Sequence, residues 1–438
     1  MNFSAYQKVS SYEGKVGEVK KVVLLYSGGL DTSCILKWIQ DHYHAAVVTL
    51  TLDLGQQVDD LQKIALKAKK LGAVNSYVLD VRDEFADRYL VAAIKANGSY
   101  QGDYYISTIS RYLMAEKAIE IAELEGADTI AHGCTGKGND QIRLEATALA
   151  IKPDIKIIAP VREWAMGRDE EIEYARKHGI EISQSLDFPY SSDDNMWGIT
   201  WECGEIEHPA EVPKIEKFLT VNTVEKAPEE AEMVDLEFEK GVPVALNGEK
   251  MNLADLIAEL NAIGKVHGVG VCYMIEDRVV GLKVRGVYEH PGAHILISAH
   301  KKLEIFICTR AENEFKGMVD QKWGYMCYGA LYFDPLVEDL NAFCDKLNEK
   351  VCGTVKVKLH KGKADVVALK SPYALYDEKL ATFMTDYSFN QNCSSGFIEL
   401  YGLQMKLANQ VKSKVNGTKR EHLLHEVEDE ALGARRHG

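Results

Sequence analysis

The sequence lacks paired cysteines, a long apolar run and an excess of positive charge. Its nine cysteines are scattered and none forms a CxxC pair, which argues against a zinc ribbon and a thioredoxin-like site. No stretch reaches the roughly 18 apolar residues that a membrane-spanning helix requires. The 66 Asp and Glu residues outnumber the 51 Lys and Arg residues, giving a formal net charge of −15. Because such a chain repels phosphate backbones, we expect neither a nucleic acid nor a membrane as its partner.

The first 20 residues are polar and mixed in charge, and they lack the apolar core of a signal peptide. Scattered cysteines in odd number are typical of reduced thiols in the cytosol, so we expect a cytoplasmic protein. Apolar residues, in contrast, are plentiful. They make up 46% of the 438 residues, which suffices for two or three structural units.

Short β-rich runs alternate with helical segments through the first third of the chain. This alternation predicts a parallel sheet with helices on both faces. The expected strands are Val22–Tyr26, Ala46–Leu54, Ser76–Leu79, Thr129–Ala131 and Ile155–Ala159. The expected helices are Ile35–Ile39, Asp59–Leu71 and Leu113–Leu124.

After about residue 182 the pattern changes to one typical of an α+β domain. We expect a loop over Asp187–Asn195 and a helix over Leu253–Ile263. The expected strands are Val234–Phe238, Val242–Leu246, 269–275 and 294–299. Toward the C-terminus, the segment Gly396–Val415 carries an apolar stripe at helical spacing, which needs a surface to cover it. The stripe consists of Leu400, Leu403, Leu407 and Val411.

The strongest local motif is Ser27-Gly28-Gly29-Leu30-Asp31-Thr32-Ser33, between an expected strand and an expected helix. Its two glycines allow the backbone to turn N–H groups inward. Those groups, three hydroxyls and the N-terminus of the next helix would form a cradle for phosphate groups. The spacing does not fit a Walker A loop. The alternative is a structural glycine turn in which Asp31 and Thr32 cap the helix.

A second glycine-rich segment, His132–Glu145, reads His-Gly-Cys-Thr-Gly-Lys-Gly-Asn-Asp-Gln-Ile-Arg-Leu-Glu. Three glycines in six residues let the backbone approach a ligand closely. Asn139 and Arg143 share a face if a helix begins here. Arg suits a carboxylate because its planar fork donates two parallel hydrogen bonds. The alternative is a charged helix start behind a flexible loop.

The first motif resembles the Ser-Gly-Gly-x-Asp-Ser/Thr loop of the ATP pyrophosphatase family. The second resembles the argininosuccinate synthase family at every fixed position of His-Gly-x-Thr-Gly-Lys-Gly-Asn-Asp-Gln-x-Arg. Segments 189–198, 276–289 and 328–336 also match, so the resemblance extends from Lys21 to about Lys414. It implies an α/β fold with four parts. These are an extension over 1–20, an adenine nucleotide alpha hydrolase-like ATP-binding domain over 21–182, an α+β synthetase domain over 183–385, and a C-terminal oligomerisation helix and tail over 386–438.

The resemblance also implies three sets of site residues. Those for ATP are Tyr26, Ser27, Gly28, Gly29, Leu30, Asp31, Thr32, Ser33, Leu52 and Gly133. Those for aspartate are Thr135, Asn139 and Asp140. Those for citrulline are Tyr104, Thr108, Asn139, Arg143, Ser191, Thr200, Glu276 and Tyr288. Asp31 is the implied contact for Mg²⁺, which would arrive with the nucleotide.

One segment departs from the family pattern Tyr-x-x-Gly-Thr-Ser-x-Ala-Arg-Pro. In this chain the segment Tyr104–Tyr112 is one residue shorter, lacks the Gly and places Ser before Thr. Tyr104 and Thr108 keep hydroxyls at the two positions that the family uses for citrulline. A related ureido or amide acceptor is therefore retained as an alternative.

The implied activity is an ATP-dependent ligation of citrulline and aspartate through a citrullyl-adenylate, a step of arginine biosynthesis that releases AMP and pyrophosphate. The family implies a homotetramer that uses Mg²⁺. No protein nucleophile is required, and either Asp140 or a phosphate oxygen could take the proton from the aspartate amine. The alternatives are a tRNA-modifying enzyme with the same nucleotide domain, another amidating ATP pyrophosphatase, and a silent nucleotide-binding scaffold. The first would need reactive cysteines and a basic surface, and the second an ammonia source.

Overall fold

The computed structural model describes residues 15–58, 60–164, 168–181, 188–382 and 390–416. By its internal contacts the chain divides into a first unit, residues 1–375, and a second unit, residues 376–438. Several expectations lie outside the described residues: most of the N-terminal extension, the domain borders after residues 182 and 385, and the charged tail 421–438.

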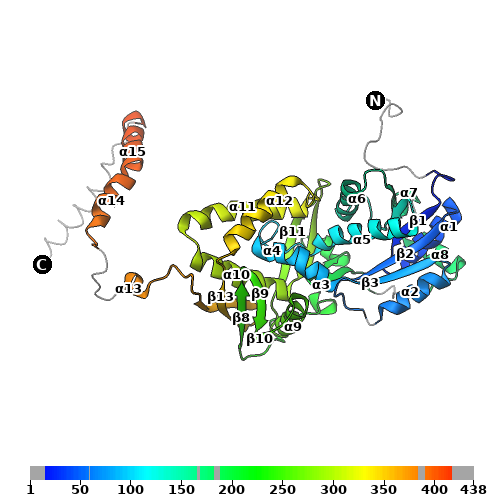
Figure 1. The fold of residues 1–438 in the computed structure, drawn as a ribbon, viewed down its shortest axis with the longest axis horizontal. Coiled ribbons are helices and arrows are strands. Elements are labelled where there is room, and N and C mark those ends of the chain that lie inside the picture. Colours follow the sequence, from blue (N-terminus) through cyan, green and yellow to red (C-terminus); the bar gives the residue numbers. More distant parts are fainter. Residues whose placement is uncertain (1–14, 59, 165–167, 182–187, 383–389, 417–438) are drawn as a thin grey trace, which may run out of the picture. The chain divides into compact units, whose positions relative to one another are not determined.

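A parallel sheet forms the N-terminal half of the first unit (Figure 1). Its strands are β1 (Lys21–Leu25), β2 (Ala46–Asp53), β3 (Asn75–Asp80), β4 (Thr129–Ala131) and β5 (Lys156–Ile158). They pair in the order β3-β2-β1-β4-β5, and every pair is parallel. The expected parallel sheet is therefore confirmed, and each expected strand differs from the observed one by at most one residue at either end.

Helices cover both faces of this sheet because alternate residues of β1 are buried on opposite sides. Val22 and Leu24 pack in one apolar cluster with α1, whereas Val23 and Leu25 pack in the cluster that contains α5. Burial on both faces explains why the strand reads as a continuous apolar run. The helices of this half are α1 (Leu30–Tyr43), α2 (Leu61–Lys70), α3 (Arg82–Phe85), η2 (Ala86–Leu90), α4 (Val91–Lys95), η3 (Ser107–Ile109), α5 (Ser110–Glu125), α6 (Asp140–Ile151), α7 (Pro160–Glu163) and α8 (Arg168–Lys177).

The strand order brings the two glycine-rich motifs together. β1 and β4 are neighbours and run in the same direction, so their carboxyl ends lie at the same edge of the sheet. The first motif, Ser27–Ser33, here called the phosphate loop, follows β1. The second motif, which begins at His132, follows β4. The chain leaves β1 toward β2 but returns on the other side to β4, and in such sheets ligands bind beyond the carboxyl ends at this switch point.

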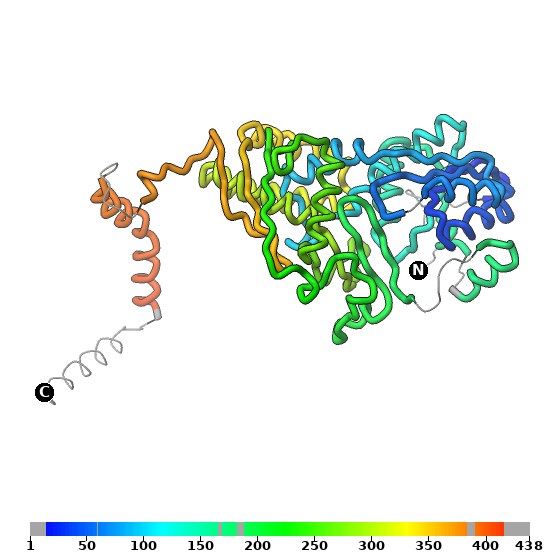
Figure 2. The backbone as a smooth tube through the Cα atoms, turned by 90° about the horizontal axis from the view of Figure 1, so that it is seen from below, coloured from blue at the N-terminus to red at the C-terminus, as the bar shows by residue number. Residues whose placement is uncertain are grey.

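Two antiparallel sheets make up the C-terminal half of the first unit, which lies beside the parallel-sheet half (Figure 2). The first contains β8 (Glu232–Glu239), β9 (Val242–Leu246), β10 (Glu249–Lys250), β13 (Gly353–His360) and β14 (Lys363–Lys370), in the order β10-β9-β8-β13-β14. The second contains β6 (Ser191–Asn195), β7 (Gly198–Glu202), β11 (Val271–Asp277) and β12 (Lys283–Glu289), in the order β11-β12-β7-β6. The helices are η4 (Gly204–Glu207), η5 (Ile215–Lys217), α9 (Leu253–Val266), α10 (Pro291–Ile307), α11 (Arg310–Tyr328) and α12 (Pro335–Asn348).

The expected strand at 294–299 is wrong, because these residues lie inside helix α10. The run His294-Ile295-Leu296-Ile297 is rich in β-branched residues, but α10 is buried on most of its circumference. A short apolar run does not distinguish a buried helix from a strand. The better signal was Pro291, which occupies the first turn of the helix.

The expected loop over Asp187–Asn195 is also wrong for its last five residues, which form β6 and pair with β7. The sequence Ser-Ser-Asp-Asp-Asn has a low intrinsic preference for strand. Pairing with the neighbouring strand therefore decides its structure. Residue 187 itself lies outside the described part of the chain.

The second unit contains α13 (Glu378–Ala381), α14 (Cys393–Tyr401) and α15 (Leu403–Asn416). The helical stripe expected over Gly396–Val415 is therefore divided at Gly402, a residue of low helix propensity. The four side chains of the stripe are exposed. Among the described residues of both units, no helix is long and apolar enough to cross a membrane.

Candidate active site

The phosphate loop joins β1 to α1 through a backbone turn that only glycine adopts easily. Gly28 has φ +77°, and a Cβ atom there would lie 2.8 Å from Cγ2 of Ile64. Lys67 donates a hydrogen bond of 2.8 Å to the carbonyl of Gly28. Gly29 is the N-cap of α1 and supplies no side-chain acceptor for the first N–H groups of the helix. Those groups are the donors that an anion at a helix N-terminus uses.

This loop borders a cavity of about 620 Å³, here called the phosphate-loop cavity. Its walls include Tyr26, Ser27, Gly29, Leu30, Asp31, Thr32, Leu52 and Gly133, which are eight of the ten residues predicted for ATP. Ser33 does not line it, because its buried hydroxyl donates to the Gly29 carbonyl at 2.6 Å and lies 3.0 Å from the Tyr26 hydroxyl. Ser33 thus stabilises the loop by hydrogen bonds within the protein. This differs from the expectation that the hydroxyls of Ser27, Thr32 and Ser33 all face the phosphates.

A second cavity of about 300 Å³, here called the acceptor cavity, lies next to the first. It is lined by all ten residues predicted for aspartate and citrulline, which come from the segment before α5, the loop after β4, α6 and four strands. These residues are Tyr104, Thr108, Thr135, Asn139, Asp140, Arg143, Ser191, Thr200, Glu276 and Tyr288. Their roles in binding stay a prediction, but the fold brings side chains that are up to 184 positions apart into one small cavity.

The two cavities share one wall, formed by Gly133, Cys134, Asp140, Ser192 and Asp193. A phosphate group held by the first loop and an amino acid held in the acceptor cavity would therefore lie against the same five residues. This is the arrangement that a transfer between nucleotide and acceptor requires.

Alternating charges line the shared wall. The guanidinium of Arg111 donates to Asp140 at 3.0 Å and also pairs with Asp193. Arg143 donates to the other oxygen of Asp140 at 2.8 Å. Burial alone would raise the pKa of Asp140, but the two guanidinium groups outweigh it and lower that pKa to about 2. Sequence reasoning missed Arg111, although it stands inside the quoted segment Tyr104–Tyr112.

Two phenols hold the carboxylate of Glu276. Tyr288 donates to one of its oxygens and Tyr328 to the other. Burial raises the pKa of both tyrosines, so both phenols stay protonated and act as donors. Tyr328 is the last residue of α11, and it was not among the predicted site residues although its segment, 328–336, matches the family pattern.

The segment that departs from the family pattern still delivers its hydroxyls to the acceptor cavity. The Tyr104 hydroxyl lies 3.2 Å from Oγ1 of Thr108, and the Tyr104 ring stacks on Tyr288 with 4.7 Å between ring centroids. The turn is made by Ile106, which has φ +51°. A β-branched residue rarely adopts this conformation, so the backbone here is strained.

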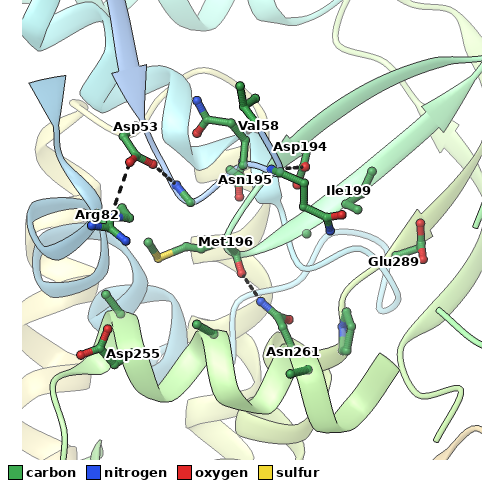
Figure 3. A pocket seen from close by; sticks show the side chains of 18 of the residues that line it. Asp53, Val58, Arg82, Asp194, Asn195, Met196, Ile199, Asp255, Asn261 and Glu289 are labelled. Carbon is green, nitrogen blue, oxygen red and sulfur yellow. Dashed lines mark hydrogen bonds and ion pairs between the residues drawn. The ribbon is translucent and has the colours of Figure 1, made fainter. Parts of the chain in front are cut away.

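A third cavity, of about 670 Å³, lies beside the phosphate-loop cavity (Figure 3). Gln56, Gln57, Val58 and Asp194 line both. Asp194 accepts a hydrogen bond of 2.8 Å from the Gln57 amide, and Asn261 donates to the Met196 carbonyl at 2.8 Å. These two hydrogen bonds hold the turn between β6 and β7 in place. They thereby position β6, the strand that carries Ser191 and Asp193.

Asp194 is expected to lower stability as the pH rises. Burial raises its pKa to about 6 from an ordinary value of 3.8, so the folded state holds the proton more tightly. The resulting stabilisation is present below about pH 4 and is lost as the pH rises through about 6. Asp194→Asn keeps an acceptor for the main-chain N–H of Gln57 but has no charge. Above pH 6 its free energy of unfolding should therefore exceed that of the wild type by about 1 kcal/mol. Urea unfolding at pH 5 and pH 8 measures this, and an equal difference at both pH values would contradict it.

Comparisons with known proteins agree with the motifs in both halves. The model "Arginosuccinate synthase N-terminal HUP domain" matches residues 21–181, and "Arginosuccinate synthase C-terminal domain" matches residues 190–408. The argininosuccinate synthase of Geobacillus thermodenitrificans is 49% identical over 397 residues, which are 90% of this chain and 97% of the relative. That of Pyrococcus furiosus is 49% identical over 399 residues, with 91% and 96% covered. That of Streptococcus mutans is 46% identical over 396 residues, with 90% and 99% covered.

A solved structure with some likeness is the U34-tRNA thiolase NcsA from Methanococcus maripaludis. It shares 16% identity over 40% of this chain and 61% of its own, with a TM-score of 0.26, which is too low to bear on function. The two family models and the full-length relatives, in contrast, confirm the resemblance that the motifs indicate. The chain therefore belongs to the argininosuccinate synthase family, which is a family of ligases.

Proposed function

We propose that this protein joins citrulline to aspartate at the expense of ATP, through a citrullyl-adenylate, and releases AMP and pyrophosphate. The observation that carries the proposal is the wall shared by the phosphate-loop cavity and the acceptor cavity. The membership of the chain in its family and the identity of its full-length relatives support the same activity.

The phosphate loop is proposed to hold the two phosphates that leave. The ureido oxygen of citrulline attacks the α-phosphorus, the bond from that phosphorus to the pyrophosphate oxygen breaks, and the backbone N–H groups of residues 27–32 receive the departing charge. Mg²⁺ bound with the nucleotide would neutralise phosphate charge. Asp31 is the proposed contact for this ion because Asp31 lines the phosphate-loop cavity. The amine of aspartate then attacks the activated carbon, and the bond from that carbon to the AMP oxygen breaks.

The acceptor cavity has unused hydrogen-bonding capacity of the required kind. Glu276 accepts from two phenols, which leaves lone pairs for the citrulline ammonium. Among the residues that the structure describes, Arg143 uses three of its five N–H groups, which leaves two for a carboxylate. Thr135, Asn139 and Asp140 lie beside the shared wall, where they are proposed to hold aspartate.

Asp140 is better suited to hold an ammonium than to remove its proton. A carboxyl whose pKa is about 2 is a weak base at neutral pH. Of the two proton acceptors considered from the sequence, we therefore propose a phosphate oxygen, with Asp140 orienting the amine. No side chain of the protein needs to act as a nucleophile in this scheme.

The bond that is cleaved can be followed with oxygen-18 in the ureido group of citrulline. With MgATP and labelled citrulline, the protein is expected to place the label in AMP after quenching, and to release pyrophosphate in equal amount. Formation of ADP, with label in inorganic phosphate, would contradict the adenylation route. Repeating the pyrophosphate measurement with close ureido analogues tests the acceptor itself.

We also propose, from the family resemblance, that the protein works in the cytoplasm as a homotetramer. The exposed apolar side chains of the second unit support an intersubunit role for α14 and α15, because such a stripe needs a partner surface. These include Phe397, Ile398, Leu400, Tyr401, Leu407 and Val411.

A further inference from the structure

We propose that Tyr328 is a positioning residue that ties together the side chains for the two amino-acid substrates. The inference rests on the proposed function. Tyr328 does not itself line the acceptor cavity, so it would act through the residues that do.

Tyr328 contacts three of the ten residues that are predicted to bind citrulline and aspartate in the acceptor cavity. Its hydroxyl accepts a hydrogen bond of 2.7 Å from Nδ2 of Asn139 and donates to Oε1 of Glu276. Its main-chain carbonyl accepts from Arg143 twice, at 3.1 Å from Nε and 2.9 Å from Nη2. These three residues are the ones proposed to contact aspartate, the citrulline ammonium and the citrulline carboxylate.

The direction of these bonds is fixed by proton count. A phenol has one proton, and Tyr328 gives it to the carboxylate of Glu276, which can only accept. Asn139 must therefore donate to Tyr328, which determines which way its amide is turned. The amide oxygen of Asn139 accepts from the Val279 N–H at 2.9 Å, so one N–H of Asn139 is left for a substrate.

The ring of Tyr328 cannot turn away from this position. It is 1% exposed and stacks on Tyr100, with 3.5 Å between the ring centroids and 1° between the planes. Tyr100 in turn donates a hydrogen bond of 2.8 Å to the carbonyl of Asp277, the neighbour of Glu276. The guanidinium of Arg143 lies over the Tyr328 ring, 4.8 Å from its centroid. Packing thus holds the ring in place, and the two hydrogen bonds hold the hydroxyl between Asn139 and Glu276.

Tyr328→Phe removes the hydroxyl but keeps the stacked ring and the main-chain carbonyl. We expect the KM values for citrulline and for aspartate each to rise about tenfold, which is about 1.4 kcal/mol, because Glu276 and Asn139 both lose the hydroxyl that orients them. The KM for ATP should change by less than about twofold, since Tyr328 does not contact the phosphate loop. Steady-state pyrophosphate release, with each of the three substrates varied in turn, gives all three values.

Tyr325→Phe is the matched control. Tyr325 lies one turn earlier in α11 and packs on the same Tyr100 ring at 4.8 Å, yet among the described residues it makes no hydrogen bond to a side chain of the acceptor cavity. Its three KM values should equal those of the wild type. Tyr100→Leu is a second test, because it frees the Tyr328 ring without removing the hydroxyl. It should raise the two amino-acid KM values together.

A Tyr328→Phe enzyme in which both amino-acid KM values stay unchanged, or only one rises, would overturn the inference. So would an equal rise in the KM for ATP, which would indicate a general loss of structure. If Tyr328→Phe does not fold, Tyr100→Leu decides by the same criteria. Failure of the proposed function is distinguishable, because the wild type itself would then form no AMP from citrulline.

Discussion

Replacing Glu276 with Gln is expected to lower kcat/KM for citrulline by roughly 30- to 4000-fold. Removing one charge from a buried, hydrogen-bonded pair typically costs about 2–5 kcal/mol, and each 1.4 kcal/mol is about a factor of ten. Glu276 is 6% exposed and accepts from both Tyr288 and Tyr328. Gln has nearly the same shape but no charge, and its amide nitrogen cannot accept from either phenol. The phenol that faces this nitrogen then loses the acceptor for its proton, and the citrulline ammonium loses its counter-charge.

Glu276→Gln should change the kinetic constants for citrulline but not those for ATP. Glu276 lines the acceptor cavity but not the phosphate-loop cavity, so the KM for ATP should change by less than about twofold. Asp277→Asn is the control, because this neighbouring carboxylate has a side chain 50% exposed and pairs with Lys283 instead of facing the cavity. It should leave kcat/KM for citrulline within about twofold of the wild type. If Glu276→Gln and Asp277→Asn behaved alike, Glu276 would not be the contact for the ammonium.

The position of the site could be predicted from the sequence because it depends on local signals and on topology. The Gly-Gly turn follows a buried strand, and the segment from His132 follows another, so parallel pairing of the two strands suffices to bring them to one edge. In the parallel sheet, the strand ends were also predicted to within one residue. Gly270, outside both motifs, is a site of backbone crowding, since a Cβ there would lie 2.6 Å from the carbonyl carbon of His290.

The partners of the site residues could not be predicted in this way. Tyr328 meets Asn139 across 189 positions, and nothing in the pattern around either residue indicates the contact. Arg111 meets Asp140 across 29 positions, from a different helix. The first contact depends on how the two halves of the unit pack, and the second on how α5 packs against α6. The inward turn of Ser33 also depends on contacts that the motif does not indicate, since its hydroxyl donates to the Gly29 carbonyl and lies 3.0 Å from the Tyr26 hydroxyl.

Two misassigned elements show where local preference was misleading. The polar run that ends at Asn195 forms a strand because β7 pairs with it along five residues. The apolar run around Leu296 forms part of a helix because α10 is covered on most sides by the antiparallel sheet and by α9. In both cases the neighbouring element, and not the intrinsic preference of the residues, determined the outcome.

Gly28→Ala is expected to lower the rate of pyrophosphate release by more than about 100-fold. The new methyl group would lie 2.8 Å from Cγ2 of Ile64, so either the loop or the side chain must move. A backbone with φ +77° also costs an L-residue about 1–2 kcal/mol. Displacing the phosphate-binding N–H groups by about 1 Å misaligns the α-phosphorus with its attacking oxygen, which typically costs about 100-fold in rate. The measurement is pyrophosphate release at saturating citrulline and aspartate.

Two further variants separate the clash from the strain. Gly126→Ala places a methyl group at φ +61° with no described atom within 4 Å, so it should lower stability by about 1–2 kcal/mol and leave the rate unchanged. Adding Ile64→Ala to Gly28→Ala removes the clash but not the strain, so it should restore part of the rate. If Gly28→Ala lost no more activity than Gly126→Ala, the turn at Gly28 would not shape the site of the leaving phosphates. The pyrophosphate would then have to be held by groups other than the amides that follow β1.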